Sequence, residues 1–155
     1  MKLTFITTLI LLCSFSPVKD GYKEITVCEA LKQITAAMKT AKYSGLVEGT
    51  GEDGYFACKI DIAKWDDEQV FYDKATEFSF TATYNASGTS DAKSAYAELK
   101  KTVAKCLKLE PLVMEMSDGE TVLFEISETT RIEIDLFAGN SGGDSWIDMK
   151  VTRDL

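Results

Sequence analysis

The alternation of apolar and polar residues over 112–151 constrains the fold most strongly, because it repeats in four short runs. A period of two places alternate side chains on opposite faces of a β-strand, so each run predicts a strand with one buried face. Polar turns at Asp118-Gly119 and at 139–143 separate the runs and predict an antiparallel four-stranded meander. The predicted inward residues are Leu112, Met114 and Met116; Val122, Phe124 and Ile126; Ile132, Ile134 and Leu136; and Ile147, Met149 and Val151.

Two helices are predicted upstream of this pattern. Thr26 and Glu29 have the spacing of a capping box, and the apolar stripe that follows predicts a helix ending before Gly45. A second stripe, which includes Tyr96, Leu99, Val103, Cys106 and Leu107, predicts a helix that ends before Pro111. Thr89 or Ser90 is the expected N-cap of that helix.

Two more strands are predicted between the helices. One covers residues 55–62 and ends before the acidic residues Asp66, Asp67 and Glu68, and the other covers 77–84. The predicted inward residues are Phe56, Cys58, Ile60 and Ile62 in the first strand and Phe78, Phe80, Ala82 and Tyr84 in the second. The sequence therefore predicts an α+β fold, with two helices packed on one face of a mainly antiparallel sheet in the order α-β-β-α-β-β-β-β.

The N-terminal segment has the features of a secretory signal peptide. Lys2 precedes an apolar run over residues 3–13, which is shorter than the roughly 20 residues needed to span a bilayer as a helix. We expect a signal peptide over 1–16, cleavage between residues 14 and 21, and no stable membrane span. A lipid anchor on Cys13 is disfavoured because Leu12 is larger than the residues that usually precede such a cysteine. The remaining residues 22–155 are expected to form a single globular α+β domain, since 45% of the chain is hydrophobic and 27% is charged.

The charge of the chain limits its partners. Seventeen basic and twenty-five acidic residues give a net charge of -8. An anionic surface repels nucleic acid and anionic membranes, so partners bound through phosphate groups are not expected. A basic macromolecule or a neutral ligand fits this charge better, and the sequence does not define the oligomeric state.

The residue types needed for several kinds of catalysis are missing from the sequence. The chain contains no histidine, which excludes Ser/His/Asp triads, Cys/His dyads and histidine-based zinc sites. No phosphate-binding loop or dinucleotide fingerprint is present, and the acidic segments 52–54 and 63–68 lack the ligand spacing of a calcium loop. We therefore expect no cofactor and no metal ion.

Removal of the signal peptide leaves three cysteines, Cys28, Cys58 and Cys106. An oxidising compartment permits one disulfide among them, and all three could instead be small buried hydrophobic residues. If a bridge forms, Cys58 and Cys106 are the expected pair, because one lies in the inward set of a strand and the other on the apolar stripe of a helix.

The last hairpin contains the candidate binding residues. Pairing Leu136 with Ile147 keeps both residues on the inward face and places Phe137 opposite Trp146 on the outer face. The same register pairs Glu133 with Lys150, which is favourable, and Asp135 with Asp148, which is not. Phe137 and Trp146 are either an ordinary cross-strand aromatic pair or an anchor for a partner.

These observations favour an exported binding or inhibitor-type protein. The rival hypothesis is a carboxylate-dependent hydrolase that uses an acid pair like that of a glycosidase, either Glu133 with Asp135 or Glu125 with Asp148. These acids could instead lie on the solvated face of the sheet, among Arg131 and Lys150.

Overall fold

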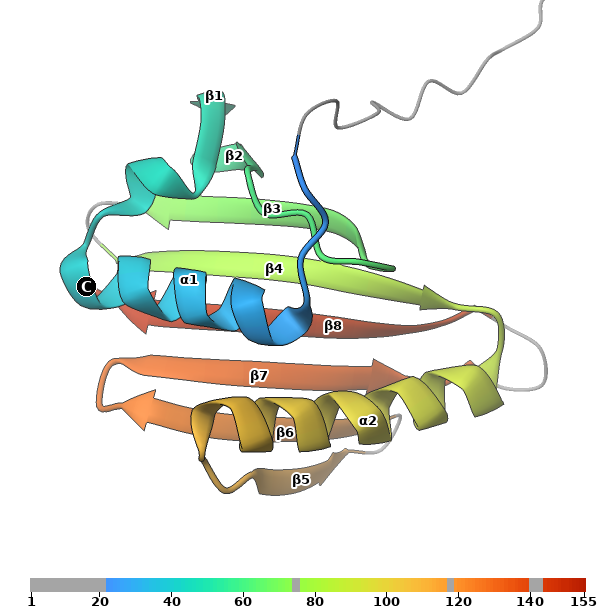
Figure 1. Cartoon of the computed structure of the whole chain (residues 1–155). Coiled ribbons are helices and arrows are strands. Elements are labelled where there is room, and N and C mark those ends of the chain that lie inside the picture. The colour runs from blue at the N-terminus through green and yellow to red at the C-terminus, as the bar shows by residue number, and fades with distance from the viewer. Residues whose placement is uncertain (1–21, 74–75, 117–118, 140–143) are drawn as a thin grey trace, which may run out of the picture.

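Two helices and one antiparallel sheet form the structure, a computed structural model that describes residues 22–73, 76–116, 119–139 and 144–155 (Figure 1). The helices are α1 (Val27–Thr40) and α2 (Thr89–Leu107), and a 3-10 turn covers Tyr43–Gly45. The eight strands found in these residues are β1 (Val47–Glu52), β2 (Tyr55–Cys58), β3 (Asp66–Asp73), β4 (Glu77–Ala86), β5 (Leu112–Met116), β6 (Gly119–Ser127), β7 (Thr130–Phe137) and β8 (Ser145–Asp154).

The strands follow the order β1-β2-β3-β4-β8-β7-β6-β5 across the sheet. The predicted meander is confirmed, since β5 pairs with β6, β6 with β7 and β7 with β8, each antiparallel. The last strand then pairs with β4 along its whole length, from Glu77↔Asp154 to Ala86↔Ser145. This pairing joins two four-stranded halves, and α2 carries the chain from β4 in the middle of the sheet to β5 at its edge.

A single hydrophobic cluster contains residues of both helices and of the sheet. It contains Leu31 and Ile34 of α1, Leu99 and Val103 of α2, and the inward residues of the central strands. In Figure 1, α1 lies in front of β4 and β8, and α2 lies in front of β6 and β7. We call the face that contributes to this cluster the helix-covered face, and the opposite face the open face.

The start of α1 agrees with the predicted capping box. The Thr26 hydroxyl accepts a hydrogen bond from the Glu29 backbone N–H at 3.2 Å, and the Glu29 carboxylate accepts one from the Thr26 N–H at 2.9 Å. The helix ends at Thr40, where Ala41 adopts the left-handed conformation with φ 52°. The Arg153 guanidinium donates to the carbonyl oxygen of Met38, which fixes this end of α1 to β8.

The predicted N-cap of α2 was wrong. Gly88 occupies the N-cap position without a side-chain hydrogen bond, and both Thr89 and Ser90 lie inside the helix. The Thr89 hydroxyl instead donates to the Gly139 carbonyl oxygen at 3.2 Å. Asp91 in the first turn accepts hydrogen bonds from the backbone N–H and hydroxyl of Ser87, which lower the pKa of Asp91. The start of α2 is thus held by a carboxylate inside the helix.

The predicted order of elements was incomplete, because four strands and not two lie between the helices. β1 is absent from the prediction because its residues are exposed apart from a partly buried Val47 and show no alternation. β3 is also absent, because Glu68 lies among acidic residues that predict a polar interruption. Glu68 in fact points inward, is only 4% exposed, and accepts a hydrogen bond from the Ile62 backbone N–H at 2.8 Å.

The predicted strand 55–62 is shorter in the structure. β2 ends at Cys58, and the chain beyond it leaves the sheet even though Ile60 and Ile62 are buried. Ile62 forms an isolated parallel bridge with Ile25, so the apolar residues after Cys58 pack beneath the segment that precedes α1. Alternate residues therefore stay buried beyond Cys58, where the strand pairing ends.

The predicted inward residues are correct in the centre of the sheet and wrong at its edge. All six inward residues predicted for β7 and β8 are buried, as are Val122 and Phe124 of β6. In β5, however, Leu112 pairs with Leu123 and Met114 pairs with Thr121, so both lie on the open face. Leu112 and Met114 are 53% and 47% exposed.

The disulfide joins Cys106 to Cys28, so the predicted pairing of Cys106 with Cys58 was wrong. Cys28 lies in the first turn of α1 and Cys106 in the last turn of α2, and their Cα atoms are 5.7 Å apart. Cys58 is buried at the end of β2. α2 lies over the other half of the sheet (Figure 1), which explains why Cys106 faces α1 and not β2.

Three features predicted from the sequence lie wholly or partly outside the described residues: the signal peptide over 1–16, Asp118 of the first turn, and the loop residues 140–143. Within the described part of the chain, no helix is long and apolar enough to cross a membrane.

Candidate functional site

The open face around the last hairpin holds the two predicted binding residues. The predicted register is observed: Leu136 pairs with Ile147, Phe137 with Trp146, and Asp135 with Asp148. Residues that are directly opposite in an antiparallel pair project to the same face, and so do alternate residues along each strand. Phe137 and Trp146, which we call the aromatic pair, therefore share the open face with Asp135 and Asp148, the acid pair.

The aromatic pair is a well-defined stack. The ring centroids of Phe137 and Trp146 are 4.8 Å apart, and the ring planes differ by 18°. Phe137 is 39% exposed and Trp146 is partly buried. The Trp146 indole Nε1 donates to the Asp148 carboxylate at 3.2 Å, which fixes the orientation of the indole. The structure thus presents a preorganised, partly solvent-accessible aromatic surface.

The acid pair lies next to the stack, and threonines on both sides compensate its like charges. The Thr83 hydroxyl of β4 donates to Asp148 at 2.7 Å, and the Thr121 hydroxyl of β6 donates to Asp135 at 2.5 Å. A carboxylate can accept about four hydrogen bonds, so both groups keep sites for a further donor. The pair remains a local concentration of negative charge beside the stack.

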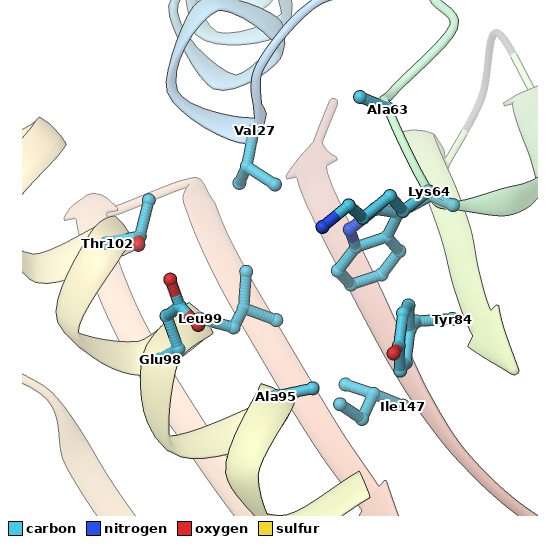
Figure 2. Close-up of a pocket in the computed structure, with 10 residues that line it drawn as sticks. Val27, Ala63, Lys64, Tyr84, Ala95, Glu98, Leu99, Thr102 and Ile147 are labelled. Carbon is cyan, nitrogen blue, oxygen red and sulfur yellow. The ribbon is translucent and has the colours of Figure 1, made fainter. Parts of the chain in front are cut away.

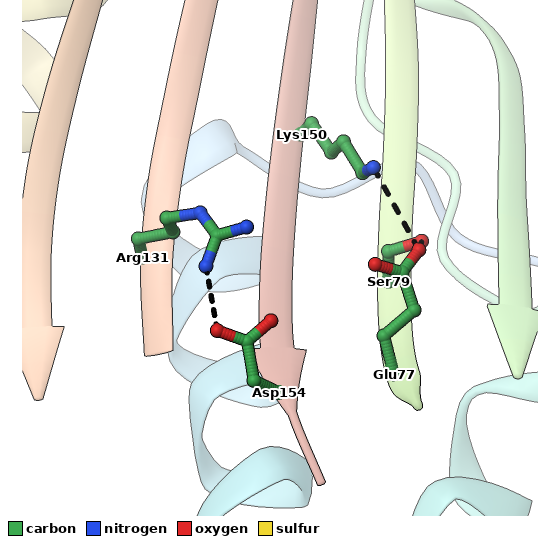
Figure 3. A network of polar contacts seen from close by, with 5 residues as sticks. All are labelled: Glu77, Ser79, Arg131, Lys150 and Asp154. Carbon is green, nitrogen blue, oxygen red and sulfur yellow. Dashed lines mark hydrogen bonds and ion pairs between the residues drawn. The ribbon is translucent and has the colours of Figure 1, made fainter. Parts of the chain in front are cut away.

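Basic residues lie farther along the same strands (Figure 3). Lys150 Nζ is 3.7 Å from a Glu77 carboxylate oxygen, and the Arg131 guanidinium lies 2.8 Å from the Asp154 carboxylate. Lys150 is also directly opposite Glu133, as predicted. The open face therefore changes along the strands from aromatic, through acidic, to mixed charge.

Apolar residues on the β5 side of the open face were missed. Leu112 and Met114 are about half exposed, and the partly buried Leu123 lies beside Leu112. The sequence contained a signal for this register: pairing Met116 with Gly119, as the structure does, places Met114 opposite the polar Thr121. The same turn-parity argument gave the correct register in the last hairpin.

A cavity on the helix-covered face was also missed (Figure 2). Its volume is about 230 Å³, and its walls come from the start of α1, the segment between β2 and β3, β4, β8 and α2. The residues that line it are Val27, Ala63, Lys64, Trp65, Tyr84, Ala95, Glu98, Leu99, Thr102 and Ile147. No sequence signal marks such a cavity, because its lining comes from five separate parts of the chain.

The four carboxylates of the hydrolase hypothesis lie on the strands of the open face. Glu133 and Asp135 are alternate residues of β7, while Glu125 and Asp148 lie on strands separated by β7. None of the four lines the cavity described above. Among the described residues, no group of three or more potential metal-ligating side chains is close enough to hold an ion.

Comparison with known proteins gives no relative: no protein-family model matches the chain, and no curated protein or solved structure matches it significantly. Functional interpretation therefore rests on the geometry of the open face and the cavity.

Proposed function

We propose that this chain is an exported binding or inhibitor-type protein that captures a protein partner on its open face. In this proposal both helices pack on one face of the sheet, and the other face is left for recognition. The observation that carries the proposal is the stacked aromatic pair beside the acid pair. Aromatic side chains that are rigid and partly exposed are the residues at which binding free energy concentrates in protein interfaces.

The chemistry of this surface favours a basic segment of the partner. An arginine or lysine placed over the aromatic pair gains a cation–π interaction and is close enough to the acid pair for a charge-assisted hydrogen bond. The net charge of -8 also accelerates association with a cationic partner over longer distances. Arg131 and Lys150 provide positions for acidic side chains of the same partner.

The carboxylate-dependent hydrolase remains the rival function, and the geometry favours it less. Acid pairs that cleave glycosides act from opposite sides of a bond held in a cleft. Both candidate pairs, Glu133 with Asp135 and Glu125 with Asp148, instead project from one sheet face. One member of each is held by neighbouring side chains, Asp135 by Thr121 and Asp148 by Thr83 and the Trp146 indole. This arrangement suits recognition of a cation better than transfer of a proton.

The proposal is tested by partner capture with matched variants. The mature protein is immobilised, incubated with the extracellular or periplasmic fraction of its source, and the captured proteins are quantified by mass spectrometry. Trp146→Ala should lose the captured partner and lower the melting temperature only modestly, because Trp146 is already partly exposed. Added salt should also weaken capture by wild type, since the proposed contacts are ionic and salt screens them.

Tyr55→Ala is the matched control for loss of an exposed aromatic residue. Tyr55 is 55% exposed and contacts Phe71 at a ring distance of 4.9 Å, in β2 and β3 at the other end of the sheet. This variant should retain the partner. Equal capture by wild type and Trp146→Ala, or equal loss in both variants, contradicts the role of the aromatic pair. An intact Met1 on the native protein contradicts export by a cleaved signal.

A further inference from the structure

The cavity between α2 and the segment before β3 has the size of a small-molecule site. Its volume is about 230 Å³, whereas an apolar cavity of roughly 150 Å³ is sufficient for benzene. A benzene-sized ring with a short substituent therefore fits, whereas sites for drug-sized ligands usually begin at about 300 Å³. The volume thus favours a compact molecule.

The floor and one wall of the cavity are apolar and aromatic. Tyr84 and Ile147, which pair across β4 and β8, form the floor with Leu99 of α2. The Trp65 ring lies 6.0 Å from the Tyr84 ring at an interplanar angle of 56°. The Tyr84 hydroxyl donates to Asp91 at 3.4 Å, so the ring is held in place. Tilted aromatic walls of this kind favour a ligand with an aromatic or bulky aliphatic body.

Two side chains of opposite charge line the cavity, Lys64 from the segment before β3 and Glu98 from α2. Figure 2 shows the Lys64 ammonium group directed across the cavity toward α2, with Glu98 and Thr102 on the opposite side. Within the described part of the chain, neither Lys64 nor Glu98 forms an ion pair or a hydrogen bond through its side chain. Both charges are thus available to a ligand.

We propose that this cavity binds a free α-amino acid with an aromatic side chain. The side chain occupies the apolar floor between Trp65 and Leu99, the ligand carboxylate pairs with Lys64, and the ligand ammonium group pairs with Glu98. A zwitterion is the class that matches one cation and one anion on opposite walls, because it can pair with both side chains, whereas a ligand with a single charge can pair with only one.

This site is independent of the aromatic pair on the open face. Ile147 and Trp146 are consecutive residues of β8, so their side chains project to opposite faces of the sheet. A negative binding result at one site therefore does not contradict the proposal for the other. The two tryptophans of the chain, Trp65 and Trp146, report on the cavity and the open face separately.

The test is an NMR titration of ¹⁵N-labelled mature protein with L-phenylalanine. The indole N–H signal of Trp65 should shift in a saturable way, with a dissociation constant of about 1 mM or lower, while the signal of Trp146 stays in place. Trp65→Phe assigns the two signals. Phenethylamine, which lacks the carboxylate, and 3-phenylpropanoate, which lacks the ammonium group, should each bind about fivefold more weakly.

Two variants connect each ligand charge to one side chain. Lys64→Met should weaken L-phenylalanine about fivefold and leave phenethylamine unchanged, and Glu98→Gln should weaken L-phenylalanine similarly and leave 3-phenylpropanoate unchanged. Lys101→Met and Glu110→Gln remove exposed charges outside the cavity lining and should have no effect.

Three results overturn the proposal. One is the absence of any saturable shift of the Trp65 signal, and another is equal binding of L-phenylalanine and its two singly charged analogues. The third is a shift of the Trp146 signal alone, which places the ligand on the open face.

Discussion

The disulfide between Cys28 and Cys106 should make the stability of this protein depend strongly on redox conditions. The two residues are 78 positions apart, so the bridge closes a long loop of the unfolded chain. The loop-entropy relation gives a stabilisation of about 4.5 kcal/mol for a loop of this length, as an upper value. Since domains of this size are usually stable by roughly 5–15 kcal/mol, loss of the bridge removes a large fraction of the total.

The double variant Cys28→Ala/Cys106→Ala isolates this contribution without leaving a single reactive thiol. Guanidinium unfolding curves of wild type and variant, each with and without dithiothreitol, give the four free energies of unfolding. The reductant should lower the wild-type value by as much as about 4.5 kcal/mol and leave the double variant unchanged. Reduction should also raise the number of thiols titrated in the unfolded wild-type chain by two.

Cys58→Ala is the control for loss of a buried cysteine. It removes a side chain that is 1% exposed and whose sulfur accepts a hydrogen bond from the Ile60 N–H, so stability should fall for reasons of packing. The effect of the reductant on this variant should nevertheless equal that on wild type. A wild-type unfolding midpoint that does not change with reductant, or a reductant effect that disappears in Cys58→Ala, refutes the assigned bridge.

Three further predictions test individual contacts. Hydrogen bonds from Thr26 lower the pKa of Glu29 below its ordinary value of 4.5, so Glu29→Gln should lower the melting temperature at neutral pH. The difference between the two proteins should vanish as the pH falls below 4.5 and through the lowered pKa of Glu29. Glu68→Ala leaves the buried Ile62 N–H without this acceptor and should cost about 1–3 kcal/mol in urea unfolding. Met114→Ala on the open face should cost less than about 1 kcal/mol, whereas Val122→Ala in the core should cost about 2 kcal/mol.

The central strands could be predicted from the sequence because their alternation and their burial agree. Over residues 131–137 of β7 and 146–152 of β8, each inward position is apolar and each outward position is polar or aromatic, so a shift by one residue would expose the core. This strict pattern, together with the parity of the turn, is sufficient to predict the register of Phe137 and Trp146 from the sequence alone. The capping box of α1 was predictable for a similar reason, because its contacts are local.

The prediction missed β1 and β3 for two different physical reasons. β1 lies at the edge of the sheet and buries little, so no hydrophobic signal marks it. β3 places Glu68 in the interior, where the Ile62 N–H compensates a carboxylate that the pattern treats as solvent-exposed. The cavity was unpredictable for a third reason. Tyr84, Leu99 and Ile147 each have the pattern of core residues, and only their tertiary arrangement leaves space between them.

The acid pair shows that the electrostatics of a sheet face cannot be judged from a single hairpin. Considered alone, the opposition of Asp135 and Asp148 counts against the register of the last hairpin, since like charges directly across a strand pair are destabilising. The hairpin is flanked by β4 and β6, however, and each flanking strand contributes a threonine to the nearer carboxylate. The register is therefore fixed by the two paired strands, and its electrostatic cost is set by their neighbours. One of these neighbours, β4, is separated from the hairpin in sequence by α2, β5 and β6. Because those threonines compensate the charges without neutralising them, the face keeps a negative surface beside the Phe137–Trp146 stack, as the proposed recognition of a basic partner requires.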